Sequence, residues 1–110
     1  MTYVDLDAGI QHAGGNRALY LRFARRFQDD PTFWVLQNAL YNGDISLAFR
    51  SAHTLKGIAA QLGFSPLARQ AGALCELLRP QDTHALKAAR AHFHALRTIY
   101  ESTLSELSVL

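Results

Sequence analysis

His53 is the residue whose type and neighbours best suit a chemical role. Arg50 precedes it by three positions, Lys56 follows it by three and Gly57 by four. If this segment is helical, residues three and four apart lie side by side on its surface, so the imidazole would stand between two cations. Neutral imidazole is a nucleophile, and neighbouring cations favour a dianionic phosphoryl group. The pattern therefore indicates a histidine that could carry a phosphoryl group.

Gly57 is unusual because nothing in the sequence marks a helix end there. The apolar pattern continues as far as Leu62, and a glycine inside a helix costs roughly 1 kcal/mol relative to alanine. A reason other than helix stability is therefore indicated. With no side chain at Gly57 and only a methyl group at Ala60, the surface one turn beyond His53 is predicted to be flat enough for another protein to approach the imidazole.

A docking surface is predicted on the same face as His53. Gly57 and Ala60 belong to it, and Gln61 and Phe64 lie eight and eleven residues beyond the histidine, which places them on its side of a helix. An exposed Phe64 would support this role. The alternative for Phe64 is packing inside the turn that follows the helix.

The elements that must position these residues are helices, because helix punctuation rather than strand alternation separates the apolar segments. Asp44 caps the start of the histidine segment and Gly63 ends it. Another helix begins at Ser65-Pro66 and stops at Arg79-Pro80, and a last one follows from Asp82. The connections are short, so the sequence predicts an all-α, up-and-down antiparallel four-helix bundle. Its inward positions in these three helices are Ile45, Ala48, Ala52, Leu55, Ala59, Leu62, Leu67, Ala71, Leu74, Leu78, Leu86, Ala89, Phe93, Leu96, Tyr100 and Leu107.

The N-terminal part is predicted to add one short extra helix over residues 5–12. Asn16 then caps a longer helical segment, which Pro31 interrupts before it ends at Asn42-Gly43. The sequence leaves open whether this segment is one helix kinked at Pro31 or two helices end to end. The expected inward stripe is Leu19, Phe23 and Phe27, followed by Phe33, Leu36 and Leu40.

Length and composition indicate one globular domain over residues 1–110. Hydrophobic residues make up 49% and charged residues 18%, which is ordinary globular usage. No apolar run approaches the roughly 20 residues of a membrane helix, and an acid stands where a signal peptide would be basic. A cytoplasmic location without membrane contact is therefore expected. The net charge of +2 does not require nucleic acid.

Other residues that could do chemistry have plainer interpretations. Cys75 is the one cysteine and is expected to be a small buried residue. His92 and His94 are two positions apart, so a helix would point them away from each other and no metal site is expected. The arginines Arg22, Arg25 and Arg26 are expected to form a solvated helix face.

The histidine segment resembles a known family. Residues 53–57, His-Thr-Leu-Lys-Gly, with Leu62-Gly63 beyond them, closely resemble the phosphorylation motif of histidine-containing phosphotransfer (HPt) domains. Residues 15–31 resemble the upstream helix of HPt domains found at the C-terminus of hybrid sensor kinases, and residues 42–44 resemble the turn before the active helix. The resemblance runs from about Leu6 to Arg79, and the last helix is similar only in its pattern.

The resemblance implies a function in two-component phosphorelays. His53 would accept a phosphoryl group from the aspartate of a response-regulator receiver domain and pass it to another receiver. Lys56 would hold the phosphoryl oxygens, and Gly57 would leave room for the receiver. Arg50 is expected from its spacing alone to be a second phosphate-stabilising cation. No bound cofactor is implied, because the receiver would supply Mg²⁺. The domain would be a monomeric phosphocarrier without kinase activity, and a hybrid sensor kinase in cis is a further expected partner.

One position departs from the family pattern. Many HPt domains carry Gln or Glu about 22 residues after the histidine, where it orients the imidazole, and Cys75 occupies that position here. Gln70 and Glu76 are nearby in sequence, but a rotation of 100° per residue turns Glu76 from the direction of Cys75, so the sequence leaves the orienting group open. A different class of function also remains open, in which the basic helix around Arg17 to Arg26 makes a scaffold or nucleic-acid contact and His53 has no role.

Overall fold

The structure is a computed structural model that describes residues 2–110, and this part of the chain contains helices and no strand. The elements are α1 (Leu6–His12), α2 (Arg17–Arg26), a 3₁₀ turn η1 (Phe27–Asp29), α3 (Thr32–Asn42), α4 (Ile45–Gln61), α5 (Ser65–Leu78) and α6 (Thr83–Leu107). The all-α prediction is confirmed.

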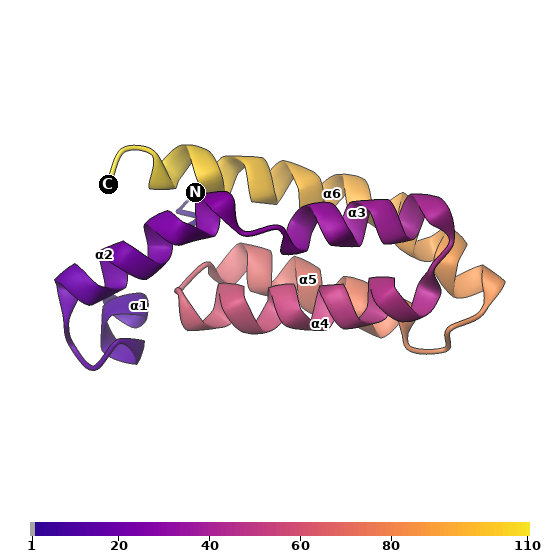
Figure 1. Cartoon of the computed structure of the whole chain (residues 1–110), viewed down its shortest axis with the longest axis horizontal. Helices are drawn as coiled ribbons and strands as arrows, with labels where there is room; N and C mark the ends of the chain where they lie inside the picture. Colours follow the sequence, from indigo (N-terminus) through magenta and orange to yellow (C-terminus); the bar gives the residue numbers. More distant parts are fainter. Residues whose placement is uncertain (1) are drawn as a thin grey trace.

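Helices α3 to α6 form the up-and-down bundle, and α1 and α2 lie at one end of it (Figure 1). Neighbours in the chain pack against each other, α3 on α4, α4 on α5 and α5 on α6, and α6 also contacts α3. The molecule is elongated, with extents of 43 × 23 × 22 Å. The exposed side of α4 is therefore flanked by α3 and α5, and the α1–α2 pair lies near its C-terminal end.

The break at Pro31 separates two helices. Asp30 is extended, with φ −73° and ψ 127°, as expected for a residue that precedes proline. Its carboxylate accepts a hydrogen bond of 2.8 Å from the backbone N–H of Thr32 and so supports the start of α3. The question that the sequence left open is thus answered by two helices joined through η1.

Of the expected inward stripe Leu19, Phe23 and Phe27, only Phe27 is buried, and the inward assignment of Phe23 was wrong. Phe23 is 42% exposed, and the buried residues are Tyr20, Ala24 and Phe27. The helix is rotated by about one residue because Tyr20 enters the interior with both its ring and its hydroxyl. Most of the other predicted inward positions are buried, and Ile45 and Leu86 are half-buried against the core.

Aromatic rings fill the centre of the bundle. Phe33 of α3 stacks on Tyr100 of α6 with ring centroids 3.9 Å apart, and it also stacks on Phe93 at 5.4 Å. Phe27 packs edge-to-face on Phe64 at 5.1 Å and on Tyr100 at 5.9 Å. These contacts tie α3, η1 and α6 to the turn that follows α4, and such aromatic pairs contribute beyond the area they bury.

The C-terminal end of α4 is held by the N-terminal elements. Gly63 is left-handed (φ +79°), and the N–H groups of Gly63 and Phe64 donate to Ala60 and Ala59, which is the Schellman arrangement for ending a helix. The carbonyl of Leu62 accepts a bond of 2.6 Å from the Tyr20 hydroxyl. The Gly63 carbonyl accepts one of 2.8 Å from the Asp5 N–H.

Replacing Tyr20 with phenylalanine is expected to lower the free energy of unfolding by about 1–2 kcal/mol, because the Leu62 carbonyl loses its buried donor. Burial, with a smaller contribution from the Asp5 carboxylate, raises the pKa of Tyr20, so the hydroxyl keeps its proton. Urea denaturation measures the change. Tyr41→Phe is the matched control, since Tyr41 is 62% exposed. Equal losses in the two variants would show that the Leu62 bond contributes nothing.

Candidate functional site

His53 lies on the exposed side of α4, away from the side chains that pack into the core. Ala52 and Leu55 are fully buried on the opposite side, while the imidazole faces solvent. The helix starts where the sequence predicted, because the Asp44 carboxylate accepts a hydrogen bond of 3.1 Å from the Leu47 N–H. Of the hydrogen bonds found in residues 2–110, none involves the His53 ring. The ring nitrogens are therefore open to an incoming group.

The two predicted cations lie on opposite sides of His53. Arg50 borders a shallow groove of about 230 Å³ between α3 and α4, which Thr54 also lines. Lys56 instead extends toward α5, where its methylene groups lie over Gly72. Both residues are exposed. The histidine is thus flanked by one positive charge on the α3 side and another on the α5 side, an arrangement suited to a dianion.

The surface beyond His53 is open, as predicted. A Cβ placed on Gly57 would find no atom within 4 Å outside its own helix turn, and Gly57, Ala60 and Gln61 are all exposed. The Gln61 side chain is also engaged with α1, since its Nε2 donates to the His12 carbonyl at 3.4 Å. The His12 Nδ1 in turn lies 3.0 Å from the Gln61 carbonyl. Sequence reasoning missed His12, because only the fold brings α1 to this end of α4.

Phe64 corrects the predicted docking surface. Its side chain is completely buried and packs against Phe27, so it cannot contact a partner. The reason lies in the Schellman turn at Gly63, where the second residue after the helix commonly makes an apolar contact back into the core. Continuing the helical periodicity of α4 through this turn gave the wrong direction for Phe64.

The position expected to orient the imidazole carries no polar group. Cys75 is 3% exposed, and burial raises the pKa of its thiol, although Arg79 and Lys56 act in the other direction. The neighbouring Glu76 is exposed and forms an ion pair of 2.7 Å with Arg79. The hydrogen bond from Arg79 is the largest cause of the lowered pKa of Glu76, and Lys56 contributes a smaller part. The negative charge of Glu76 on α5 therefore interacts with the positive charge of Lys56 on α4.

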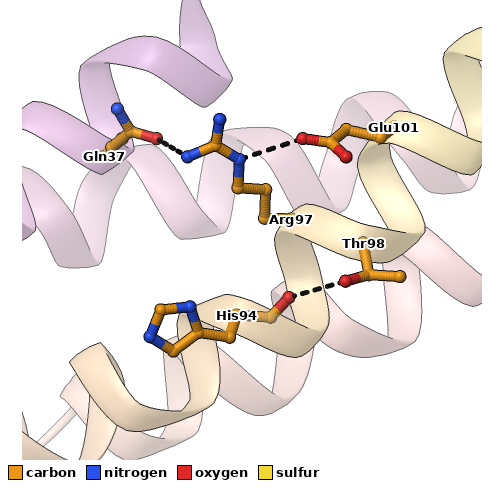
Figure 2. A network of polar contacts seen from close by, with 5 residues as sticks. All are labelled: Gln37, His94, Arg97, Thr98 and Glu101. Atoms are coloured by element: carbon orange, nitrogen blue, oxygen red, sulfur yellow. Dashed lines mark hydrogen bonds and ion pairs between the residues drawn. The ribbon is translucent and has the colours of Figure 1, made fainter.

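The other histidines and the arginines of α2 have different surroundings from His53. No group of metal-binding side chains occurs in the described part of the chain. Figure 2 shows His94 contributing only its backbone carbonyl, to the Thr98 hydroxyl, while Arg97 links Gln37 of α3 to Glu101. Three arginines of α2 are exposed around a surface hollow that Asp29 also lines. They are Arg22, Arg25 and Arg26.

Comparison with known families identifies the family to which this chain belongs. The model of the Hpt domain matches residues 33–106, which is more than half of the chain and includes His53. This chain belongs to the Hpt domain family. Hpt domains take part in phosphorelays as histidine phosphotransfer modules that interact with receiver domains, and they are phosphocarriers rather than kinases. No curated protein and no solved structure shows a significant match.

The bounds of the match differ from the resemblance expected from sequence. The Hpt match extends through most of α6, as far as residue 106, and it begins only at Phe33. The elements α1 and α2 thus lie outside the matched region, even though they hold the end of α4.

None of the helices in residues 2–110 has the length and apolar character needed to span a membrane.

Proposed function

We propose that His53 is the phosphoacceptor of this Hpt domain, taking a phosphoryl group from a receiver aspartate and passing it to a second receiver. The observation that carries the proposal is an exposed imidazole that no hydrogen bond within residues 2–110 engages, beside an open surface at Gly57 and inside the matched region. It agrees with the phosphotransfer role of the family. Monomeric state, attachment to a hybrid kinase and a cytoplasmic location stay predictions.

The chemistry needs little from the bundle besides the histidine. The lone pair of the outer ring nitrogen, Nε2, attacks phosphorus, a P–N bond forms and the P–O bond to the receiver aspartate breaks, which restores the carboxylate. The other ring nitrogen keeps its proton. Lys56 and Arg50 stabilise the charge on the phosphoryl oxygens, and the Mg²⁺ of the receiver neutralises charge during the transfer. The reverse step on another receiver regenerates the free imidazole.

Gly57, Ala60 and Gln61 form the docking surface of this proposal, and Gly57 gives a sharp prediction. Gly57→Ala should raise the free energy of unfolding by about 0.5–1 kcal/mol, because alanine is the better helix former and its methyl group meets no neighbour. Gly57→Leu should slow transfer from the receiver about tenfold or more, because the side chain obstructs close approach. Urea denaturation measures the gain in stability of Gly57→Ala, and transfer kinetics measure the slower transfer of Gly57→Leu. A Gly57→Leu variant that transfers at the wild-type rate would remove Gly57 from the interface.

A pulse-chase experiment tests the two-way transfer. The chain is labelled by a ³²P-phosphorylated receiver with Mg²⁺, separated from it, and then mixed with a second, unphosphorylated receiver. Label should appear first on the chain and then on the second receiver. Label that reaches the chain but cannot leave it to any receiver would contradict the carrier role.

The alternative function, contact with nucleic acid through α2, rests on the exposed Arg22, Arg25 and Arg26. Asp29 lies in the same hollow, and the net charge of the chain is only +2. Retention on DNA that weakens steeply with salt would support this alternative. We expect no such retention at physiological salt.

A further inference from the structure

The side chain of Lys56 lies on α5 rather than free in solvent. A Cβ placed on Gly72 would be 3.5 Å from Cδ, 3.6 Å from Cε and 4.0 Å from Cγ of Lys56. The lysine stem therefore lies directly over Gly72, a residue in the interior of α5 (Ser65–Leu78). Glycine costs roughly 1 kcal/mol relative to alanine in such a position. The sequence therefore has a destabilising residue at the position over which the lysine stem passes.

The space above Gly72 is limited to about one methyl group. Distances of 3.5–4.0 Å are ordinary van der Waals contacts, so a methyl group at this position would touch Lys56 without moving it. Any atom beyond Cβ that extends along the same direction would occupy the volume of the lysine methylenes. Residue 72 thus determines whether the lysine can lie on α5.

The direction of the lysine also follows from the packing of the two helices. Because α4 and α5 are antiparallel neighbours (Figure 1), moving back along α4 from Lys56 to His53 corresponds to moving forward along α5 from Gly72 to Glu76. Helical side chains lean toward the N-terminus of their own helix, which for Lys56 is the direction of His53. The pKa of Glu76 is lowered chiefly by its hydrogen bond and ion pair with Arg79, and the charge of Lys56 acts in the same direction, which agrees with a lysine that leans toward this end of α5.

We propose that Gly72 is a positioning residue for phosphotransfer: its missing side chain forms the floor on which the stem of Lys56 lies, directing the ammonium group back to the level of His53. The inference rests on the proposed function of His53. It assigns to α5 a role at the site in place of the orienting polar group that Cys75 lacks. Gly72 acts through Lys56 and does not touch the phosphoryl group.

A double-mutant cycle tests the proposal in the full chain with a phosphorylated receiver and Mg²⁺. Gly72→Leu should slow transfer by about the same factor as Lys56→Ala, on the order of tenfold to a hundredfold for the loss of one charged hydrogen bond. In the Lys56→Ala background, Gly72→Leu should have no further effect. Gly72→Ala should keep the wild-type rate and be more stable to urea.

Ala73→Leu is the matched control, because Ala73 is the next residue of α5 and is exposed. It should transfer at the wild-type rate. A Gly72→Leu variant as fast as wild type would overturn the proposal, and so would losses that multiply fully in the double variant, because they would show that residue 72 acts independently of Lys56.

A second readout does not depend on phosphotransfer. In NMR spectra of the unphosphorylated chain, nuclear Overhauser contacts should join the Lys56 methylene protons to the Gly72 α protons and disappear in Gly72→Leu. Absence of these contacts in the unsubstituted chain would overturn the positioning role while leaving the proposed function of His53 intact. If these contacts are observed but the chain accepts no phosphoryl group, the proposed function is contradicted instead.

Discussion

Phe33→Ala is expected to lower the free energy of unfolding by about 3–5 kcal/mol, the usual range for removing a fully packed aromatic side chain. Phe33 is 1% exposed and stacks on two rings of α6, those of Tyr100 and Phe93. Its removal leaves a cavity between α3 and α6 that these rings cannot close by themselves. Because native domains are only marginally stable, this variant should lose much of its stability. Guanidinium denaturation, followed by far-UV circular dichroism, measures the change.

Trp34→Ala is the control for Phe33→Ala because it removes a larger ring from the adjacent position. Trp34 is 49% exposed and its main aromatic contact is an edge-to-face approach to Phe33 at 5.0 Å. We expect a loss of about 1 kcal/mol or less, as for most surface substitutions. A loss in Trp34→Ala equal to that in Phe33→Ala would mean that the core is not centred on the α3–α6 rings.

Gly63→Ala is expected to lower the free energy of unfolding by about 3 kcal/mol or more. A left-handed residue with a Cβ costs roughly 1–2 kcal/mol by itself, and Gly63 has φ +79°. Its Cβ would also collide with the backbone carbonyl of Asp5, which cannot move without breaking the bond between Asp5 and Gly63 that holds the N-terminal segment. Both effects act on the end of α4 that follows the docking surface. Urea denaturation measures the loss.

Gly15→Ala separates the two contributions to the Gly63 effect. Gly15 has nearly the same backbone conformation, φ +80°, but a Cβ there would have no atom within 4 Å. This variant should therefore show only the conformational cost of roughly 1–2 kcal/mol. Equal losses at the two glycines would contradict the close approach of the N-terminal segment to α4.

The helices and their ends were largely predictable because the signals that create them are local. Asp44, Asn16 and Asp82 each accept a hydrogen bond from a backbone N–H three residues later, as cap residues do. Gly43 and Gly63 are left-handed at the ends of α3 and α4. The periodicity of α4, α5 and α6 then identified most of the core, because a helix buries one continuous stripe.

Contacts between elements were not predictable from one sequence. Helical periodicity continued beyond Gly63 predicts Phe64 on the docking surface, with packing inside the turn as the alternative. The chain reverses at Gly63 and buries the ring, so the alternative is correct. Phe23 was assigned to the core of α2, while Tyr20 took the inward place because Leu62 offers its hydroxyl a partner. From the sequence, Gly72 is recognisable only as a glycine inside a helix. Its contact with Lys56 depends on the pairing of α4 with α5.

The site residues divide in the same way. His53, Lys56 and Gly57 carry a motif within one helix, and their spacing alone places them on one exposed surface. The course of Lys56 across Gly72 and the bond between His12 and Gln61 depend on tertiary packing. The family match supports the phosphotransfer role of the chain.

The most direct test of the central claim is to locate the phosphoryl group. The chain and its His53→Gln variant are incubated with a ³²P-phosphorylated receiver and Mg²⁺, with His94→Gln as a control for an exposed histidine on α6. We expect acid-labile, base-stable label on the wild type and on His94→Gln, and none on His53→Gln, whose fold should be unchanged because the side chain is exposed. Undiminished label on a folded His53→Gln variant, or no label on the wild-type chain from any competent receiver, would contradict the account.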